Sequence, residues 1–238
     1  MALQFSNARR VGHRKDKRMN RNYQKELDRL LDTMEKENKV PTLLLHSCCA
    51  PCSSYILEYL SQYFAITVFY YNPNIFPELE YHHRVQEQQE FITKIPQKYP
   101  IQFVEGVYDT KRFYDTVRGH EADPEGGERC YHCYELRLRE AMEVAEEGGF
   151  DYYTTSLSIS PYKNAKWLNE IGERLSEGKK VKYLPSDFKK KNGYKRSVEL
   201  SSEYGMYRQD YCGCVYSMAE RDAQKRKAEF QKTMEQKE

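Results

Sequence analysis

The sequence predicts an α/β fold in which a mostly parallel sheet carries helices on both faces. Three observations support this prediction. Short apolar runs of strand length alternate with longer helical patterns, which is typical of right-handed crossovers between parallel strands. The chain has 238 residues, enough for one well-buried α/β domain. Its apolar runs, such as residues 43–45, are far shorter than the roughly 20 residues of a membrane span, so no membrane partner is expected.

The expected elements follow one another in a regular order. Leucines at helical spacing begin after Tyr23, and Pro41 prevents that helix from continuing. We expect strands at residues 42–46, 66–70, 101–104 and 152–155, with a weaker fifth at 181–184. We expect helices at a pattern that includes residues 56, 57 and 60, over 77–99, near 131–147 and over 164–176. In a parallel sheet of this kind, functional loops lie at the carboxyl ends of the strands.

Composition along the chain predicts three segments. Residues 1–22 are polar and basic without hydrophobic periodicity, which indicates a disordered arm. Residues 23–217 form a single α/β domain, and residues 218–238 form a charged C-terminal helix. The first residues contain no apolar stretch that could serve as a signal peptide, so the sequence predicts a reducing cytoplasm. Its cysteines are therefore expected to be thiols or metal ligands.

The net charge of +2 hides two basic clusters. Residues 1–22 carry seven basic side chains and one acidic side chain. Residues 179–196 carry eight basic side chains and one acidic side chain. Such clusters on an otherwise acidic chain suggest a polyanionic partner, because each phosphate that is neutralised releases condensed counterions. The alternative, a solvated tail and a solvated loop, remains open.

All seven cysteines fall in three tight groups: Cys48-Cys49-Ala-Pro-Cys52, Cys130-Tyr-His-Cys133 and Cys212-Gly-Cys214. Cysteines used as small hydrophobic residues would be spread through the core, so the grouping indicates a metal or redox site. The first group follows a predicted strand and precedes a predicted helix. There, unpaired N–H groups and the helix dipole stabilise thiolates.

The number of cysteines bears on the kind of site. Structural zinc would use four thiolates in two CxxC pairs and would need no adjacent cysteines and no CxC. A thioredoxin-like protein needs only one CxxC. An iron–sulfur cluster with four ligands leaves three thiolates for a second redox element, which uses every cysteine. A zinc-bound RNA-binding module and a thiol–disulfide oxidoreductase using Cys212 and Cys214 remain as alternatives.

Five sequence blocks between residues 41 and 217 together resemble one known family, the epoxyqueuosine reductases of the QueH type. The blocks are HSCCAPCSSY at 46–55, YNPNIFPELEYHHR at 71–84, ERCYHCYELRL at 128–138, TTSLSISPYKN at 154–164 and DFKKKNGYKRSVELSSEYGMYRQDYCGCVYS at 187–217. Five blocks in order are far more specific than one CxxC pair.

The resemblance implies an activity and a fold. The activity is the last step of queuosine biosynthesis, in which the epoxide oxygen of epoxyqueuosine is removed at the wobble position of tRNA with a GUN anticodon. An external electron donor such as ferredoxin or flavodoxin is implied, and cobalamin is not. The implied fold is Rossmann-like and related to the adenine nucleotide alpha-hydrolases. In this chain HSCCAPCS occupies the place of their glycine-rich ATP loop, so we expect no use of ATP.

The resemblance also implies a 4Fe-4S cluster beside a second iron ion. The cluster ligands of the family carry over to Cys48, Cys49, Cys130 and Cys133. Cys52, Cys212 and Cys214 then remain for the second iron and for the catalytic centre, or Cys212 and Cys214 form a redox-active disulfide. Some members have an aspartate in place of Cys52, which leaves the ligands of the second iron open.

Candidate substrate and proton sites complete the prediction. The candidates for substrate binding are Asn72, Asn74, Glu80, Tyr81, Arg84, Ser160, Lys163, Arg208 and Gln209. The candidate proton donors, chosen because they are close in sequence to the cysteine and substrate motifs, are His46, Tyr81, His132 and Tyr211. Each has an alternative role as a packing or supporting residue. Some of the 21 tyrosines could stack on splayed anticodon bases.

Overall fold

The structure is a computed structural model that describes residues 21–235. Its centre is a five-stranded sheet in the order β3-β2-β1-β4-β5, in which every pair of neighbours is parallel. The strands are β1 (Thr42–His46), β2 (Ala65–Tyr70), β3 (Ile101–Glu105), β4 (Tyr152–Thr155) and β5 (Lys182–Tyr183). The predicted α/β class is confirmed, and the arrangement is consistent with a Rossmann-like fold.

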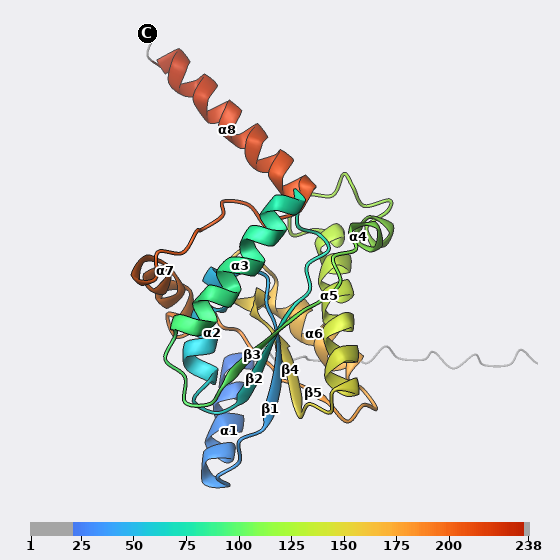
Figure 1. The fold of residues 1–238 in the computed structure, drawn as a ribbon. Helices are drawn as coiled ribbons and strands as arrows, with labels where there is room; N and C mark the ends of the chain where they lie inside the picture. The colour runs from blue at the N-terminus through green and yellow to red at the C-terminus, as the bar shows by residue number, and fades with distance from the viewer. Residues whose placement is uncertain (1–20, 236–238) are drawn as a thin grey trace, which may run out of the picture.

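Helices cover both faces of the sheet (Figure 1). One layer contains α1 (Tyr23–Lys36), α2 (Ala50–Leu60) and α3 (Glu78–Lys94), and the other contains α4 (Thr110–Thr116), α5 (Glu128–Glu147) and α6 (Ala165–Leu175). The alternation of side chains along β1 serves both layers, because Leu43 and Leu45 pack into the first and Leu44 into the second. This two-sided burial explains why the strand is a continuous apolar run.

The strand order places a topological switch point at β1. Its neighbours are β2 on one side and β4 on the other. The helices that follow β1 and β2 cover one face of the sheet, and the helices that follow β3 and β4 cover the other. In open α/β sheets, the crevice at the carboxyl ends of such strands is the usual ligand site. His46 and Thr155 are paired in register at the ends of β1 and β4, so these two residues mark the floor of that crevice.

The structure contains elements that were not predicted. These are α4, the 3-10 helix η1 (Ser156–Ile159) and α7 (Gly193–Glu203), which packs against α2. The buried positions of α7 are Gly193, Ser197, Leu200 and Ser201, so only one of them is strongly apolar. Hydrophobic periodicity is therefore weak in α7, although small residues at these positions allow close approach to α2. A Cβ atom at Gly193 would collide with the carbonyl oxygen of Phe188 and the ring of Tyr55.

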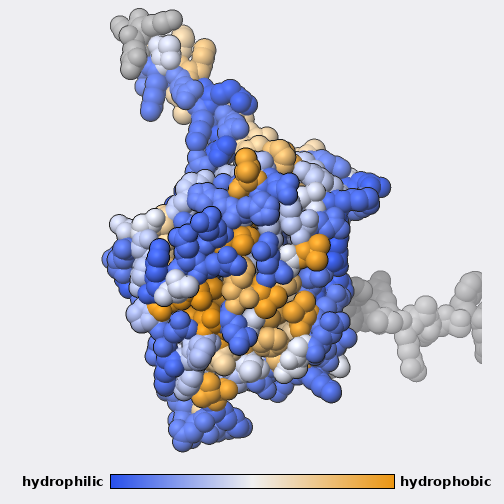
Figure 2. Space-filling model, viewed as in Figure 1, coloured by the Kyte–Doolittle hydropathy of each residue, from blue (hydrophilic) through white to orange (hydrophobic). Residues whose placement is uncertain are grey.

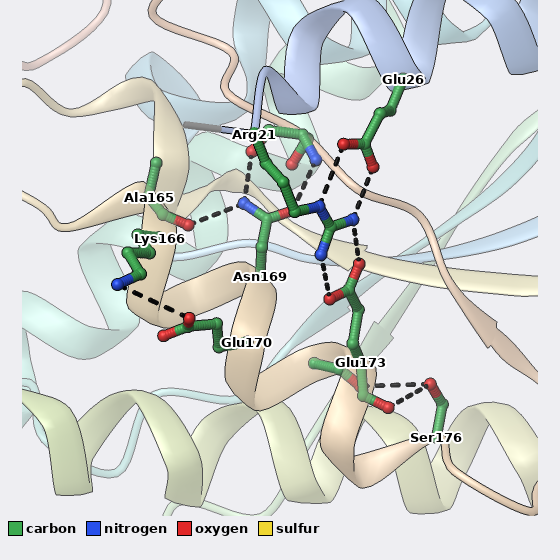
Figure 3. A network of polar contacts seen from close by, with 10 residues as sticks. Arg21, Glu26, Ala165, Lys166, Asn169, Glu170, Glu173 and Ser176 are labelled. Carbon is green, nitrogen blue, oxygen red and sulfur yellow. Dashed lines mark hydrogen bonds and ion pairs between the residues drawn. The ribbon is translucent and has the colours of Figure 1, made fainter. Parts of the chain in front are cut away.

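Arg21 attaches the start of the described chain to the body (Figure 3). Its guanidinium binds Glu173 of α6 through two contacts of 2.7 Å and binds Glu26 of α1 at 2.6 and 3.1 Å. Asn22 caps α1 by accepting a hydrogen bond from the backbone of Lys25. These last two residues of the predicted arm thus belong to the folded body, while residues 1–20 lie outside the described residues.

The last helix, α8 (Val215–Glu235), extends away from the body (Figure 1). It begins three residues before the predicted start at 218, and Ser217 is its one buried residue within the described range. Figure 2 shows hydrophilic residues over most of α8, whereas hydrophobic residues reach the surface in the middle of the body on the same view. Within residues 21–235 there is no helix that combines the length and the apolar character needed to span a membrane.

Candidate metal centre and substrate pocket

The first cysteine group lies at the switch point. Cys48 follows β1, Cys49 is the N-cap residue of α2, and Cys52 lies in the first turn of that helix. The three sulfur atoms are all within 4.8 Å of one another, and Cys48 Sγ and Cys49 Sγ are 3.8 Å apart. Pro51 is accommodated in the first turn, where its missing N–H is not needed. Three thiols at this spacing could hold one metal ion.

Buried polar side chains hold this loop in place. The Ser156 hydroxyl accepts a hydrogen bond from the backbone N–H of Cys48 at 3.4 Å and lies 3.8 Å from its sulfur. The Tyr70 hydroxyl donates to the Cys48 carbonyl oxygen at 3.2 Å, and Asn72 Nδ2 donates to the Ser47 carbonyl oxygen at 2.8 Å. The loop is therefore anchored by residues that follow or end β2 and β4.

The second group opens α5. Cys130 and Cys133 lie in its first two turns, and the backbone N–H of Gly126 donates to Cys130 Sγ at 3.3 Å. Cys133 is buried, which raises the pKa of its thiol to about 12. The CxxC spacing places both sulfurs toward the amino end of the helix, where the macrodipole favours negative charge.

The third group immediately precedes α8. The backbone N–H of Ser217 donates to Cys214 Sγ at 3.4 Å, in the first turn of that helix. Gly213 has a φ of +122°, and a Cβ atom there would lie 3.1 Å from both Arg84 Nη1 and Ile75 Cγ1. A glycine is thus required between the two cysteines. The loop is tied down by a 2.8 Å hydrogen bond from the Phe76 N–H to the Gly213 carbonyl oxygen.

The three groups converge. Cys48, Cys49, Cys133 and Cys214 belong to one buried cluster, with Cys52 and Cys130 packed against it, and Cys212 shares a pocket wall with Cys48 and Cys52. All seven cysteines lie in the described part of the chain, and each is a free thiol there. The structure groups Cys52 with Cys48 and Cys49, whereas Cys130 and Cys133 interact electrostatically with Cys212 and Cys214.

The first group shares a thiolate. Hydrogen bonds from the Cys49 and Cys52 thiols lower the pKa of Cys48 well below its ordinary value. Burial, together with the hydrogen bond to Cys48, raises the pKa of Cys49 to about 12. The pKa of Cys52 is also raised, because its thiol is hydrogen-bonded to both Cys48 and Cys49. Cys48 is therefore the thiol of this group whose deprotonated form is favoured, and deprotonated sulfur is the form that binds metals.

Cations surround the sulfurs. Arg84 and Arg137 are both buried, and the Nη2 atom of each has no hydrogen-bond partner among the described residues. Burial disfavours the charge of Lys163, but Cys212, Tyr134 and Cys48 raise the pKa of Lys163 well above its ordinary value. Together with the amino ends of α2, α5 and α8, these side chains create a positive environment around the thiols.

A pocket of about 670 Å³ opens beside this centre. Its wall contains Cys48, Cys52 and Cys212, and also the predicted substrate residues Ser160, Lys163, Arg208 and Gln209. Gln209 Oε1 is buried without a hydrogen-bond partner among the described residues. The pocket thus combines thiols, two cations without a carboxylate partner in the described chain, and an acceptor ready for a ligand donor.

Comparison with known proteins gives one consistent result. The family model for "Epoxyqueuosine reductase QueH" matches residues 43–220. The chain is 46% identical over 198 residues to the epoxyqueuosine reductase QueH of Streptococcus pyogenes serotype M1, covering 82% of this chain and 78% of the relative. It is 42% identical over 200 residues to that of Staphylococcus epidermidis, covering 82% and 84%. This chain belongs to the QueH family. A relative from Thermotoga maritima has the same name and is 34% identical over 186 residues, which cover 76% of this chain and 92% of the relative.

The residues of this QueH family member fit an anionic metal centre bound by thiolates. The donors are seven cysteines, most of them buried, and thiolate sulfur suits iron–sulfur clusters and zinc. The fit is strengthened by the buried arginine Nη2 atoms, which lack a partner within the described chain. An anionic group placed among these cations would be electrostatically stabilised.

Five predicted substrate residues do not line the pocket of this QueH protein. Asn72, Asn74, Tyr81 and Arg84 are buried, and Glu80 pairs with Arg84 at 2.7 Å. The Tyr81 hydroxyl donates to Glu105 at 3.0 Å. Asn72 and Arg84 donate to the backbone of the loops that carry the cysteines, at Ser47 and Cys212. Direct binding of substrate by them stays a prediction.

The four candidate proton donors differ in access. His46 is fully buried between Thr155 Oγ1 and the Tyr71 carbonyl oxygen, and burial lowers its pKa to about 4, so it is a neutral supporting residue. Tyr81 is equally buried, and His132 packs against the ring of His120. Tyr211 lines the pocket, but its hydroxyl donates to the Phe76 carbonyl oxygen at 2.7 Å.

Some pocket residues were missed by the sequence reasoning. They are carried by α7, α8 and the loop before α5: Tyr194, Ser197, Glu220, Arg221, Gln224, Pro124 and Glu125. Tyr194 and Ser197 lie inside the block at 187–217, and the others lie outside the five blocks, but none of them stands next to a cysteine or in a periodic pattern that marks it. Only the fold brings them to the pocket.

The basic cluster at 179–196 does not form a single surface. Lys180 and Lys182 lie at the amino end of β5, beside Glu146 and Asp151, at the edge of the sheet opposite the cysteines. Lys191 pairs with Asp28 at 2.7 Å, and Arg196 pairs with Glu58 and Glu203, each at 2.7 Å. Much of this charge is therefore neutralised or remote from the pocket.

Proposed function

We propose that this chain reduces epoxyqueuosine to queuosine at the wobble position of tRNA with a GUN anticodon. The observation that carries the proposal is the gathering of all three cysteine groups in one buried cluster beside a pocket whose wall also holds Lys163 and Arg208. Membership in the QueH family and the names of the relatives support it.

The proposed cofactor is a 4Fe-4S cluster held by Cys48, Cys49, Cys130 and Cys133. A second iron ion is assigned to Cys52, Cys212 and Cys214. When bound, these groups would supply electrons one at a time and a Lewis acid for the epoxide oxygen. Because the sulfurs of Cys48, Cys49 and Cys52 lie within 4.8 Å of one another, this assignment places ligands of the cluster and of the second iron side by side.

The reaction balances with two electrons and two protons. Both C–O bonds of the epoxide break, a carbon–carbon double bond forms, and the oxygen leaves as water. The electrons come from an external donor of the ferredoxin or flavodoxin class. The chain itself binds and orients the substrate, excludes water and supplies hydrogen bonds to the departing oxygen.

The pocket cations have separate roles in this proposal. Lys163 is half-buried and shares the pocket wall with Cys48 and Cys212, so we assign it to the epoxide oxygen. Arg208 is exposed, donates to Ser197 and Ser201, and has no carboxylate partner within the described residues, so we assign it to a tRNA phosphate. Gln209 Oε1 is left to accept a hydrogen bond from the base.

Aromatic side chains at the pocket support recognition of single-stranded RNA. Tyr162 is 78% exposed on the pocket wall, and Tyr194 of α7 is exposed on the same wall. Anticodon loops present unstacked bases, and a base stacked on an aromatic ring contributes roughly 1–3 kcal/mol. We assign these tyrosines to the nucleotides that flank the modified base.

The test is an anaerobic reaction of the iron-loaded chain with chemical reductant and tRNA that contains epoxyqueuosine. Mass spectrometry of the nucleosides should show queuosine. Iron and sulfide analysis of the same sample separates the alternatives. A colourless protein with one zinc ion per chain and no product would favour an RNA-binding module, and turnover with a dithiol but without iron would favour a thiol–disulfide oxidoreductase.

A further inference from the structure

Arg137 differs from the other buried arginines of the described chain. Three arginines in that part of the protein are almost completely buried: Arg84, Arg129 and Arg137. Arg84 pairs with Glu80 at 2.7 Å, and Arg129 pairs with Glu220 at 2.9 Å. Arg137 is 1% exposed, yet within residues 21–235 it has no carboxylate at ion-pair distance.

The contacts of Arg137 leave its charge without a compensating anion. Its Nε donates to the Cys133 carbonyl oxygen at 3.2 Å, and its guanidinium lies 5.9 Å from the centre of the Tyr134 ring. Nη2 is buried and lacks a hydrogen-bond partner among the described residues. A guanidinium cannot become neutral in a protein, and an uncompensated buried charge is strongly destabilising.

The cysteines are the groups that can compensate this charge. Arg137 lies one helical turn after Cys133 on α5, and α5 packs against β1, whose end carries Cys48. Burial opposes the charged form, but Cys133, Cys212 and Cys48 raise the pKa of Arg137 above its ordinary value. Cysteines from all three groups therefore favour the charged form of this one guanidinium.

We propose that Arg137 is the buried counter-ion of the anionic, thiolate-bound metal centre. It is a positioning residue that stabilises the metal-loaded protein and that is destabilising in the metal-free protein, where no carboxylate of the described chain compensates its charge. The inference rests on the thiolate centre of the proposed function but not on its substrate.

The test compares thermal unfolding of metal-free and metal-loaded protein. Arg137→Met keeps the aliphatic stem and removes the charge, Arg137→Gln is a second neutral variant, and Arg137→Lys keeps the charge. Arg139→Met is the matched control, because Arg139 lies on the same helix but pairs at the surface with Glu135. Iron with sulfide and zinc alone serve as separate probes, since each forms an anionic centre on thiolates.

The expected result is a smaller metal-induced rise in melting temperature for both neutral variants. Metal-free Arg137→Met should melt at or above the wild-type temperature, Arg137→Lys should recover most of the rise, and Arg139→Met should show all of it. The midpoint potential of the iron-loaded neutral variants should be more negative than wild type, because a nearby cation favours the reduced centre.

Equal destabilisation of Arg137→Met and Arg137→Gln with and without metal, at an unchanged potential, would overturn the proposal and leave a packing role. A chain that takes up neither metal would overturn it as well. Uptake of zinc alone, with the predicted effect of the variants, would support the counter-ion and contradict the iron-based function.

Discussion

The hydroxyl of Ser156 lies 3.8 Å from the sulfur of Cys48, although the two residues are 108 positions apart in the sequence. Ser156 follows β4 and Cys48 follows β1, so the contact spans the switch point of the sheet. The same hydroxyl accepts the backbone N–H of Cys48. One buried side chain thus fixes both the backbone and the sulfur of a candidate metal ligand.

Ser156→Ala should weaken metal binding. Residues that support a ligand typically contribute a factor of 10 to 100 in metal affinity, and the lost hydrogen bond should also cost about 1 kcal/mol of folding stability. Competition with a chelator measures the affinity. Ser158→Ala is the control, because Ser158 contacts Ser186 and Phe188 rather than a cysteine. Equal metal affinities of the two variants would contradict the supporting role.

Gly213→Ala should destabilise the CxC loop. The backbone at Gly213 is left-handed, and the added methyl group would meet Arg84 and Ile75. We expect a loss of roughly 1–3 kcal/mol in chemical denaturation. Gly178→Ala is the control, since Gly178 has a φ of +73° but open space around its Cβ position. If both variants lose the same stability, the close contact with Arg84 has no energetic effect.

Lys163→Met should lower the rate of epoxide reduction at saturating tRNA, because the hydrogen bond to the departing oxygen is lost while the methylene stem remains. Single-turnover kinetics measure this rate. Lys166→Met should have the wild-type rate, since Lys166 is exposed on α6 beside Glu170. An unchanged rate for Lys163→Met would remove Lys163 from the reaction.

Arg208→Gln should weaken tRNA binding. The slope of the logarithm of the binding constant against the logarithm of salt concentration should fall by about 1, the value expected for the loss of one phosphate contact. A triple change of Lys189, Lys190 and Lys191 to Gln should have a smaller effect for each charge removed, because Lys189 and Lys191 already pair with Asp187 and Asp28. Binding titrations over a range of salt concentrations test both. A steeper loss for the triple variant would place the phosphate contacts on that segment instead.

Arg21→Ala should lower the free energy of unfolding by about 1 kcal/mol, because Arg21 joins α1 and α6 through two carboxylates but is 44% exposed and screened by solvent. Arg21→Lys should recover only part of the loss, since lysine cannot bind both carboxylates with a planar fork. Urea denaturation measures the change, and an unaltered midpoint for Arg21→Ala would show that the network in Figure 3 does not stabilise the fold.

The sequence was most informative where residue type and periodicity agree. The apolar runs of β1 and β2 and the three cysteine groups could be placed correctly, because burial on both faces and thiol chemistry leave plain signals. The helix α7 gives no such signal, since it packs through Gly193, Ser197 and Ser201. Tyr81 and Arg84 were predicted to bind substrate, and both side chains are buried and lie outside the pocket wall. The contact of Arg84 with the Cys212 carbonyl oxygen joins residues 128 positions apart, so no local pattern reveals it.

The central claim is that the cysteine centre beside this pocket reduces epoxyqueuosine. The most direct measurement is a single turnover in which the iron-loaded chain is reduced in advance, freed of reductant and mixed anaerobically with tRNA that contains epoxyqueuosine. Queuosine should form in proportion to the protein, at one nucleoside for every two electrons stored, and Cys48→Ser should form none. A fully loaded and reduced wild-type chain that binds this tRNA but leaves epoxyqueuosine intact would contradict the account.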